Sequence, residues 1–298
     1  MPNRLLVFLF VPLWATGFIG ARYAMPYSEP FSFLTVRFGL TFVILAGIVI
    51  FAGRALLGWR GALSSIVAGL FMHGIYIAGV FWAVRNGMSA GMSALIVGLQ
   101  PLITAVLAGM LLGERILPRH WLGLAAGFVG VAIVLSPKLG NVADALTWPT
   151  LVAAVVAVVA MSAGTVWQKR FVAGGDLVTG TMYQYLGATV LMAIGSFAFE
   201  TRTYDMHVEL VLALIWSVLV LSIGAIVLLM RLIRAGDMAK VGSLFYLVPA
   251  VTALMAWPLF GETLSWLQLG GMALAVIGVK LATAQPAKSR PVEPSPTA

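Results

Sequence analysis

The sequence contains no cysteine and very little charge: only 9% of its 298 residues are Asp, Glu, Lys or Arg. Without cysteine, disulfides and thiol chemistry are excluded, and cysteine usage says nothing about the compartment. A soluble domain carries about 25% charged residues, because its surface faces water. The scarcity of charge, together with 61% hydrophobic residues and a mean hydropathy of +1.03, indicates a chain whose outer surface faces lipid.

The sequence also lacks the motifs of several catalytic classes. It has no G-x-x-x-x-G-K-[ST] stretch, and so no phosphate-binding loop with which to bind and hydrolyse ATP. Its ten carboxylates all fall in predicted loops, at the ends of apolar runs or in the C-terminal tail, and His73 alone does not make an intramembrane hydrolase. We therefore expect a protein that is not an enzyme and that uses no cofactor or metal.

What the sequence does contain is a series of ten apolar runs, separated by short turns rich in Gly, Pro and charge. About 20 apolar residues in a helix cross the roughly 30 Å of hydrocarbon in a bilayer, whereas barrel strands would alternate with period two. The first run is too long for the apolar part of a signal peptide. The sequence predicts an all-α integral membrane protein with ten transmembrane helices, at about residues 5–23, 32–51, 63–84, 90–112, 121–136, 148–168, 178–199, 209–230, 240–260 and 267–283.

Basic residues are distributed unevenly between alternate loops. Of the 18 Lys and Arg residues, 13 fall on the side of the membrane that holds the N-terminus, four fall on the other side, and Arg37 lies inside a span. Cytoplasmic loops are enriched in Lys and Arg, so both termini are predicted to be cytoplasmic. The same rule accounts for the net charge of +8, and no nucleic-acid partner is expected. The polar, Pro-rich tail at residues 285–298 is predicted to be disordered.

Residues 248–283 repeat the residue pattern of residues 100–135 at a constant offset of 148 positions. The residues that return 148 positions later are Pro101, Gly113, Glu114, Gly123 and Gly130, as Pro249, Gly261, Glu262, Gly271 and Gly278. Five predicted spans separate each residue from its copy, and an odd number reverses the direction of the chain. The sequence thus predicts two inverted-topology five-helix repeats, residues 1–137 and 138–284. Such repeats are characteristic of secondary transporters, in which two similar halves exchange conformations.

Ten spans, two five-helix halves and a duplicated "P…GE…G" pattern resemble the EamA branch of the drug/metabolite transporter superfamily, and within it the YddG-type exporters of aromatic amino acids. The resemblance implies export of amino acids, aromatic and other neutral, or of similar small metabolites across the inner membrane by alternating access. Two alternatives remain open: a multidrug or quaternary-cation exporter of the same superfamily, and a membrane scaffold that transports nothing. Multidrug relatives use a glutamate within the first span, and this sequence has none there.

Polar side chains inside a membrane are costly, so each one is a candidate for function. Trp, Tyr, His and Gln together would suit a neutral or zwitterionic ligand with a flat apolar part. The predicted substrate-binding residues are Trp14, Thr16, His73, Tyr76, Trp82, Gln100, Trp167, Gln184 and Tyr246. Four other tryptophans near span ends, Trp59, Trp121, Trp148 and Trp266, fit an interfacial belt instead.

Helical spacing places His73 and Tyr76 on one helix face. Pro101 and Pro249 lie near mid-span in corresponding helices and are predicted to interrupt them as hinges, although prolines also serve packing alone. The two Gly-Glu pairs are interpreted as structural helix ends. Small residues four apart in the fifth and tenth spans predict that these spans pack against each other or form a dimer face. The oligomeric state is open, and a monomer fits the pattern.

No carboxylate is visible at membrane depth, where a carrier driven by protons or sodium ions usually keeps one. The sequence therefore predicts movement of substrate down its own gradient with no obligatory ion. His73 is the one exception that the sequence offers, because it is the only group at that depth that titrates near neutral pH.

Overall fold

The computed structural model describes residues 3–113, 118–136, 147–172, 175–224, 248–262 and 265–283. Within these ranges the chain is almost entirely helical, and its β pairing is limited to one isolated bridge between Ser28 and Tyr204. The all-α prediction is confirmed. The helices, with two π-helical segments labelled η, are α1 (Asn3–Ala24), α2 (Pro30–Phe51), α3 (Trp59–Gly69), η1 (Leu70–Ile75), α4 (Tyr76–Arg85), α5 (Ala90–Val97), α6 (Gln100–Leu112), α7 (Pro118–Leu135), α8 (Trp148–Phe171), α9 (Leu177–Phe199), α10 (Val208–Ile215), η3 (Trp216–Gly224), α13 (Val248–Phe260) and α14 (Trp266–Thr283).

Local sequence signals set several of these helix ends. Thr147 caps α8 and Asp176 caps α9, each by accepting a hydrogen bond from the amide three residues further on. α6 and α13 are each followed by a left-handed glycine, Gly113 with φ 69° and Gly261 with φ 67°. The glycine of each Gly-Glu pair therefore has the structural role that the sequence predicts.

The helices have the length and the surface of membrane spans. Five helical stretches are long and apolar enough to cross a bilayer: Pro30–Phe51, Trp59–Arg85, Ala90–Leu112, Trp148–Phe171 and Leu177–Phe199. Shorter apolar helices cover Trp121–Val134, Val208–Gly224, Val248–Phe260 and Trp266–Gly278. The four predicted belt tryptophans are exposed at or near the first residue of their helices. The chain is a multi-pass membrane protein.

Helix bounds recur at the spacing of the sequence repeat. α6 and α13 end 148 residues apart, as do α2 and α9, and the described range of α7 corresponds to that of α14 at the same spacing. The π-helical segment η1 also lies within the range that corresponds to η3. The duplication therefore reaches beyond residue identity to helix ends and to an irregular helical turn.

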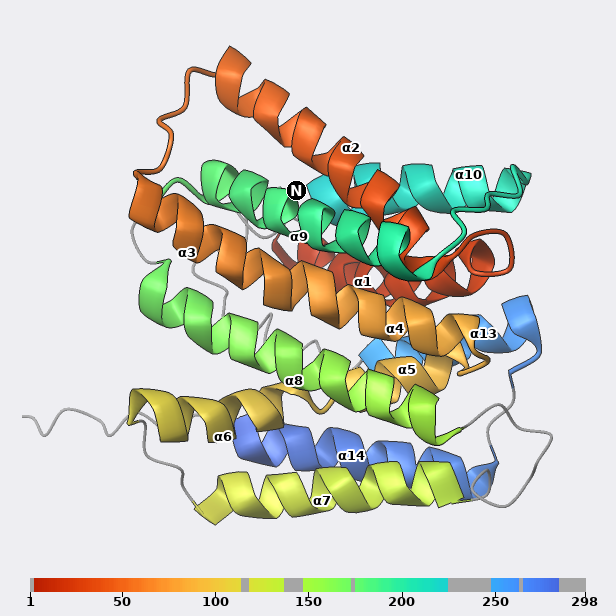
Figure 1. Cartoon of the computed structure of the whole chain (residues 1–298). Coiled ribbons are helices and arrows are strands. Elements are labelled where there is room, and N and C mark those ends of the chain that lie inside the picture. Colours follow the sequence, from red (N-terminus) through yellow and green to blue (C-terminus); the bar gives the residue numbers. More distant parts are fainter. Residues whose placement is uncertain are drawn as a thin grey trace, which may run out of the picture.

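α7 and α14 lie side by side at one edge of the bundle (Figure 1). A Cβ added at Gly130 would stand 2.5 Å from both the Ala275 nitrogen and the Gly271 carbonyl oxygen. A Cβ at Gly278 would stand 2.6 Å from the Gly127 nitrogen. Small residues on both helices therefore let the two backbones touch. Of the two roles left open by the sequence, packing of these helices against each other is the one found.

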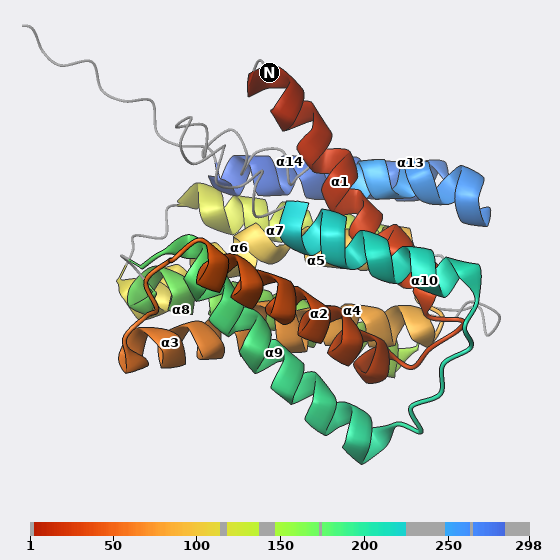
Figure 2. The same cartoon turned by 90° about the horizontal axis from the view of Figure 1, so that it is seen from above.

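α2 and α9 lie side by side at the opposite edge, and α8 runs between the two edges (Figure 1). Viewed from above, α1 passes close to both α10 and α13 (Figure 2). These contacts bring helices from the start and from later parts of the chain together around α1.

Candidate functional site

A small pocket lies between six helices, and each helix contributes to its wall. The lining residues are Trp14 and Phe18 of α1, Tyr76 of α4, Ala94 and Val97 of α5, Gly98, Gln100 and Pro101 of α6 and the turn before it, Met161 of α8 and Val248 of α13. Four of the predicted residues, Trp14, Tyr76, Gln100 and Pro101, thus come together. The cavity volume is about 30 Å³, which is enough for a few water molecules. An amino acid would enter only after the walls move apart.

The polar part of the wall is built where α5 gives way to α6. The helix ends at Val97 and restarts at Gln100, just before Pro101, which has no amide hydrogen to donate. The predicted interruption of this span is therefore present. Gln100 donates from Nε2 to the hydroxyl of Thr104 at 2.9 Å and to that of Thr165 at 3.4 Å. These hydroxyls hold the side-chain amide in place at the pocket.

The second proline lies next to this break. Pro249 lies in the first described turn of α13, at the position that corresponds to Pro101 of α6. A Cβ added at Gly98 would stand 2.9 Å from the Pro249 Cγ atom, so only glycine fits between the two helices without displacing the ring. The interruption in one half of the chain therefore touches the proline of the other half.

A chain of hydrogen bonds links η1, α9 and α8. His73 donates from Nε2 to Gln184 Oε1 at 3.1 Å, and Gln184 donates from Nε2 to Gln168 Oε1 at 3.2 Å. The His73 ring stacks on Tyr185, with ring centroids 4.5 Å apart and planes 8° from parallel. Two of the predicted residues, His73 and Gln184, are therefore direct partners.

His73 and Tyr76, which the sequence places on one helix face, both lie within electrostatic range of Arg37, but their other contacts differ. His73 contacts α9, whereas Tyr76 lines the pocket. Residues 70–75 form a π-helix, whose hydrogen bonds span five residues instead of four and widen the turn. The spacing rule used for the prediction holds for an α-helix, and this segment departs from it.

Three further predicted residues do not line the pocket. Thr16 accepts a hydrogen bond from Trp216 Nε1 at 2.9 Å, and Trp167 donates from Nε1 to the Ser64 carbonyl at 3.1 Å. Trp82 lies in the last turn of α4. Tyr246 lies outside the described residues.

Several side chains at the site were missed by sequence reasoning. Phe18, Met161 and Val248 line the pocket but are apolar residues in apolar spans, so composition gives no signal for them. Tyr185, which stacks on His73, does carry a signal, because it follows Arg37 by 148 positions. Comparing the two copies position by position would have singled it out.

Comparison with known proteins identifies the class. The sequence model of the EamA-like transporter family matches residues 3–136 and, a second time, residues 148–284. The chain belongs to this family of membrane transporters.

Individual relatives agree with this assignment. The chain is 26% identical over 278 residues to the uncharacterized inner membrane transporter YedA of Escherichia coli K12, covering 92% of this chain and 89% of that protein. It is 26% identical over 285 residues to the uncharacterized transporter YvbV of Bacillus subtilis, covering 94% and 90%. A crystal structure at 22% identity, with a TM-score of 0.66 over 94% of this chain and 96% of the other, shares the fold.

Proposed function

We propose that this transporter exports amino acids, aromatic and other neutral, or similar small metabolites across the inner membrane by alternating access. The observation that carries the proposal is a contact at the pocket between the two halves, where Gly98, in the break before α6, meets Pro249 of α13. Interrupted helices at matching places of two halves are typical of midplane substrate sites in transporters. The rings of Trp14 and Tyr76 would take a flat apolar group, and the Gln100 amide would take a polar one.

The proposed architecture has ten spans in two inverted repeats, residues 1–137 and 138–284, with both termini and the tail at 285–298 in the cytoplasm. Recurring helix bounds support it, and so do reciprocal contacts: Gly130 meets Gly271 and Ala275, while Gly278 meets their counterparts Gly123 and Gly127. Packing partners correspond in the same way, because α1 packs on α13 as α8 packs on α6. A cysteine placed at Asp144, in a predicted outer loop, should react with an impermeant reagent from outside only.

In the proposed cycle, the two halves open the pocket alternately to either side. The walls must part, since the cavity holds only a few waters in this conformation. Pro101 and Pro249 serve as hinges, because neither residue can bind α6 or α13 to the preceding turn through an amide hydrogen bond. The neighbouring π-helical turn at η1 gives the Tyr76 wall a second place to adjust.

Counterflow in proteoliposomes tests the proposal. Purified protein should exchange labelled phenylalanine, tryptophan, methionine or threonine faster than protein-free liposomes, and Gln100→Ala should slow this exchange. A quaternary-cation exporter would move a labelled ammonium ion and ignore the amino acids, and a scaffold would move neither. Either outcome contradicts the proposed function.

The coupling prediction concerns His73. The carboxylates of the described residues lie at helix ends, so we propose that no ion is obligatory. An imposed pH gradient should then change the initial uptake of a zwitterionic amino acid little, in wild type and in His73→Ala alike. Concentrative uptake driven by that gradient, lost in His73→Ala while passive exchange survives, would show instead that His73 carries the proton.

A further inference from the structure

Arg37 is the only charged side chain that is buried among the described residues, with 5% of its surface exposed. It is the eighth residue of α2, which places it roughly 10 Å along the helix from its first residue. A charge inside a membrane protein is costly unless it is paired, and such residues mark ligand or ion pathways. A buried cation in this position is therefore expected to pair with an anion.

Within the described part of the chain, no anion pairs with Arg37. Its Nε has no hydrogen-bond partner, and none of the ion pairs there includes it. Five of the acidic side chains in that part have partners elsewhere: Glu29 with Thr201 and Thr203, Asp176 with Arg54 and Thr179, Glu200 with Phe31 and Ser32, Glu209 with His207, and Glu262 with Ala90 and Gly91. Among the described residues, the guanidinium therefore has no carboxylate to compensate its charge.

Aromatic rings form the surroundings of this cation. The Arg37 Cζ atom lies 5.6 Å from the ring centroid of Phe38 and 5.8 Å from that of Phe81. Tyr76 and Tyr185 are close enough to interact with it electrostatically. Ring faces attract a cation by about 0.5–2 kcal/mol each, but they carry no net charge. These rings present flat apolar surfaces beside the guanidinium but do not neutralise its charge.

Tyr76 connects this cation to the pocket. Its side chain lines the pocket and also lies within electrostatic range of Arg37. It is the first residue of α4, directly after the π-helical turn of η1. A change in that turn would move the Tyr76 ring and open the pocket toward the guanidinium.

We propose, on the basis of the proposed function, that Arg37 binds the carboxylate of the transported substrate once Tyr76 has moved aside. A guanidinium and a carboxylate form two parallel charge-assisted hydrogen bonds, which fixes orientation as well as binding. The rings around Arg37 then contact the apolar part of the same molecule. The site would thus select substrates that carry a carboxylate and reject the corresponding amines.

Transport assays test this selectivity in proteoliposomes. Wild-type protein should exchange phenylalanine at least tenfold faster than phenethylamine or phenylalanine methyl ester. Arg37→Gln should raise the KM for phenylalanine about tenfold and remove the preference, whereas Arg37→Lys should keep part of it. Arg22→Gln is the matched control, because Arg22 also lies over a ring, that of Phe260, but in the last turn of α1. An unchanged KM in Arg37→Gln overturns the proposal.

A binding assay in detergent separates this site from transport. Phenylacetate, but not phenylethanol, should raise the melting temperature of wild type and leave Arg37→Gln unaffected. Without ligand, Arg37→Gln should melt no lower than wild type, because the substitution removes an unpaired buried charge. A lower melting temperature with phenylacetate binding intact would make Arg37 merely structural. If wild type moves no amino acid but phenylacetate binds through Arg37, the proposed function fails and the carboxylate site stands.

Discussion

The pairs α7–α14 and α2–α9 each join corresponding helices of the two sequence copies, yet the copies agree in one pair and differ in the other. In α7 and α14, the glycines at the contact are the same in both copies, Gly123 with Gly271 and Gly130 with Gly278. In α2 and α9, Arg37 corresponds to Tyr185, and Ala52 corresponds to Glu200. The two pairs lie at opposite edges of the bundle (Figure 1).

The difference follows from what touches in each pair. At these four glycines of α7 and α14 backbone meets backbone, so a larger side chain clashes in either copy; the neighbouring position is Gly127 in one copy and the small Ala275 in the other. Between α2 and α9 side chains fill the space, and each copy can carry a different one. Close backbone packing therefore holds the pair with matching glycines. In the pair that has diverged, α2 carries the buried Arg37 and α9 carries Gln184, the partner of His73 in η1.

The largest expected effect comes from placing a larger side chain at the backbone contact between α7 and α14. A Cβ at Gly271 would already stand 2.7 Å from the Gly130 carbonyl oxygen, so Gly271→Leu must force α7 and α14 apart. We expect a loss of about 3 kcal/mol or more in stability, measured as a lower melting temperature in detergent. Gly270→Leu is the matched control, because a Cβ at Gly270 meets no atom within 4 Å. Equal effects of the two substitutions would contradict the close backbone packing of α7 against α14.

A smaller effect is expected for the hydrogen bonds that join the end of α9 to the start of α2. Glu200 accepts hydrogen bonds from the Phe31 amide at 2.8 Å and from the Ser32 amide and hydroxyl at 2.7 Å each. Glu200→Ala leaves these donors unpaired at the start of α2, which should cost about 1–3 kcal/mol. Glu209→Ala, at an exposed pair with His207, should change the melting temperature much less. If both variants melt as wild type does, α2 and α9 are held by apolar contacts alone.

Sequence reasoning reached furthest where a residue type has a single structural meaning. Pro101 predicted the helix interruption, the Gly-Glu pairs predicted helix ends, which the structure has at Gly113 and Gly261, and the small residues predicted the contact of α7 with α14 as one of two roles. Each follows from sterics that any membrane helix obeys.

Sequence reasoning fell short where tertiary packing decides. The π-helical turn η1, which contains His73 and precedes Tyr76, packs against α8 and α9, and its residue types do not predict a wider turn. The apolar residues of the pocket wall, such as Met161, give no sequence signal either, because an apolar side chain suits both lipid and a cavity wall. Such features require the positions of neighbouring helices.

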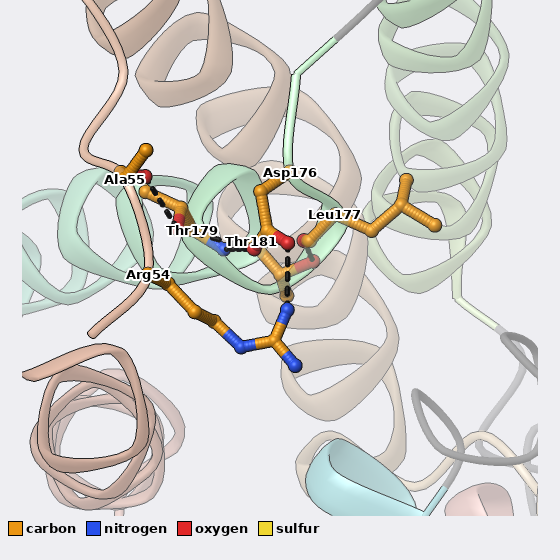
Figure 3. Close-up of polar contacts among 6 residues, drawn as sticks. All are labelled: Arg54, Ala55, Asp176, Leu177, Thr179 and Thr181. Carbon is orange, nitrogen blue, oxygen red and sulfur yellow. Dashed lines mark hydrogen bonds and ion pairs between the residues drawn. The ribbon is translucent and has the colours of Figure 1, made fainter. Parts of the chain in front are cut away.

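The opposite end of the α2–α9 pair is joined by a polar contact of another kind. Arg54 donates from Nη1 to Asp176 Oδ2 at 2.6 Å, and Asp176 Oδ1 accepts from the Thr179 amide at 2.9 Å (Figure 3). Thr179 also donates from its hydroxyl to the Ala55 carbonyl at 3.1 Å. Partial burial alone would raise the pKa of the Asp176 carboxyl, but the Thr179 amide and Arg54 together hold that pKa below its usual value.

The smallest expected effect is at Asp176, and its dependence on pH has a definite sign. Because the folded-state pKa lies below the unfolded value of about 3.9, the stabilisation is complete above that pH and is lost as pH falls through the folded pKa. Asp176→Asn keeps a helix cap but removes the ion pair, so it should cost at most about 1 kcal/mol at pH 7. Asp176→Ala should cost about 1 kcal/mol more, because the cap is lost as well. The difference in melting temperature between wild type and Asp176→Asn should stay constant from pH 8 to pH 5 and shrink below pH 4. A difference that already shrinks between pH 8 and pH 6 would mean that another group, and not this carboxyl, controls the contact.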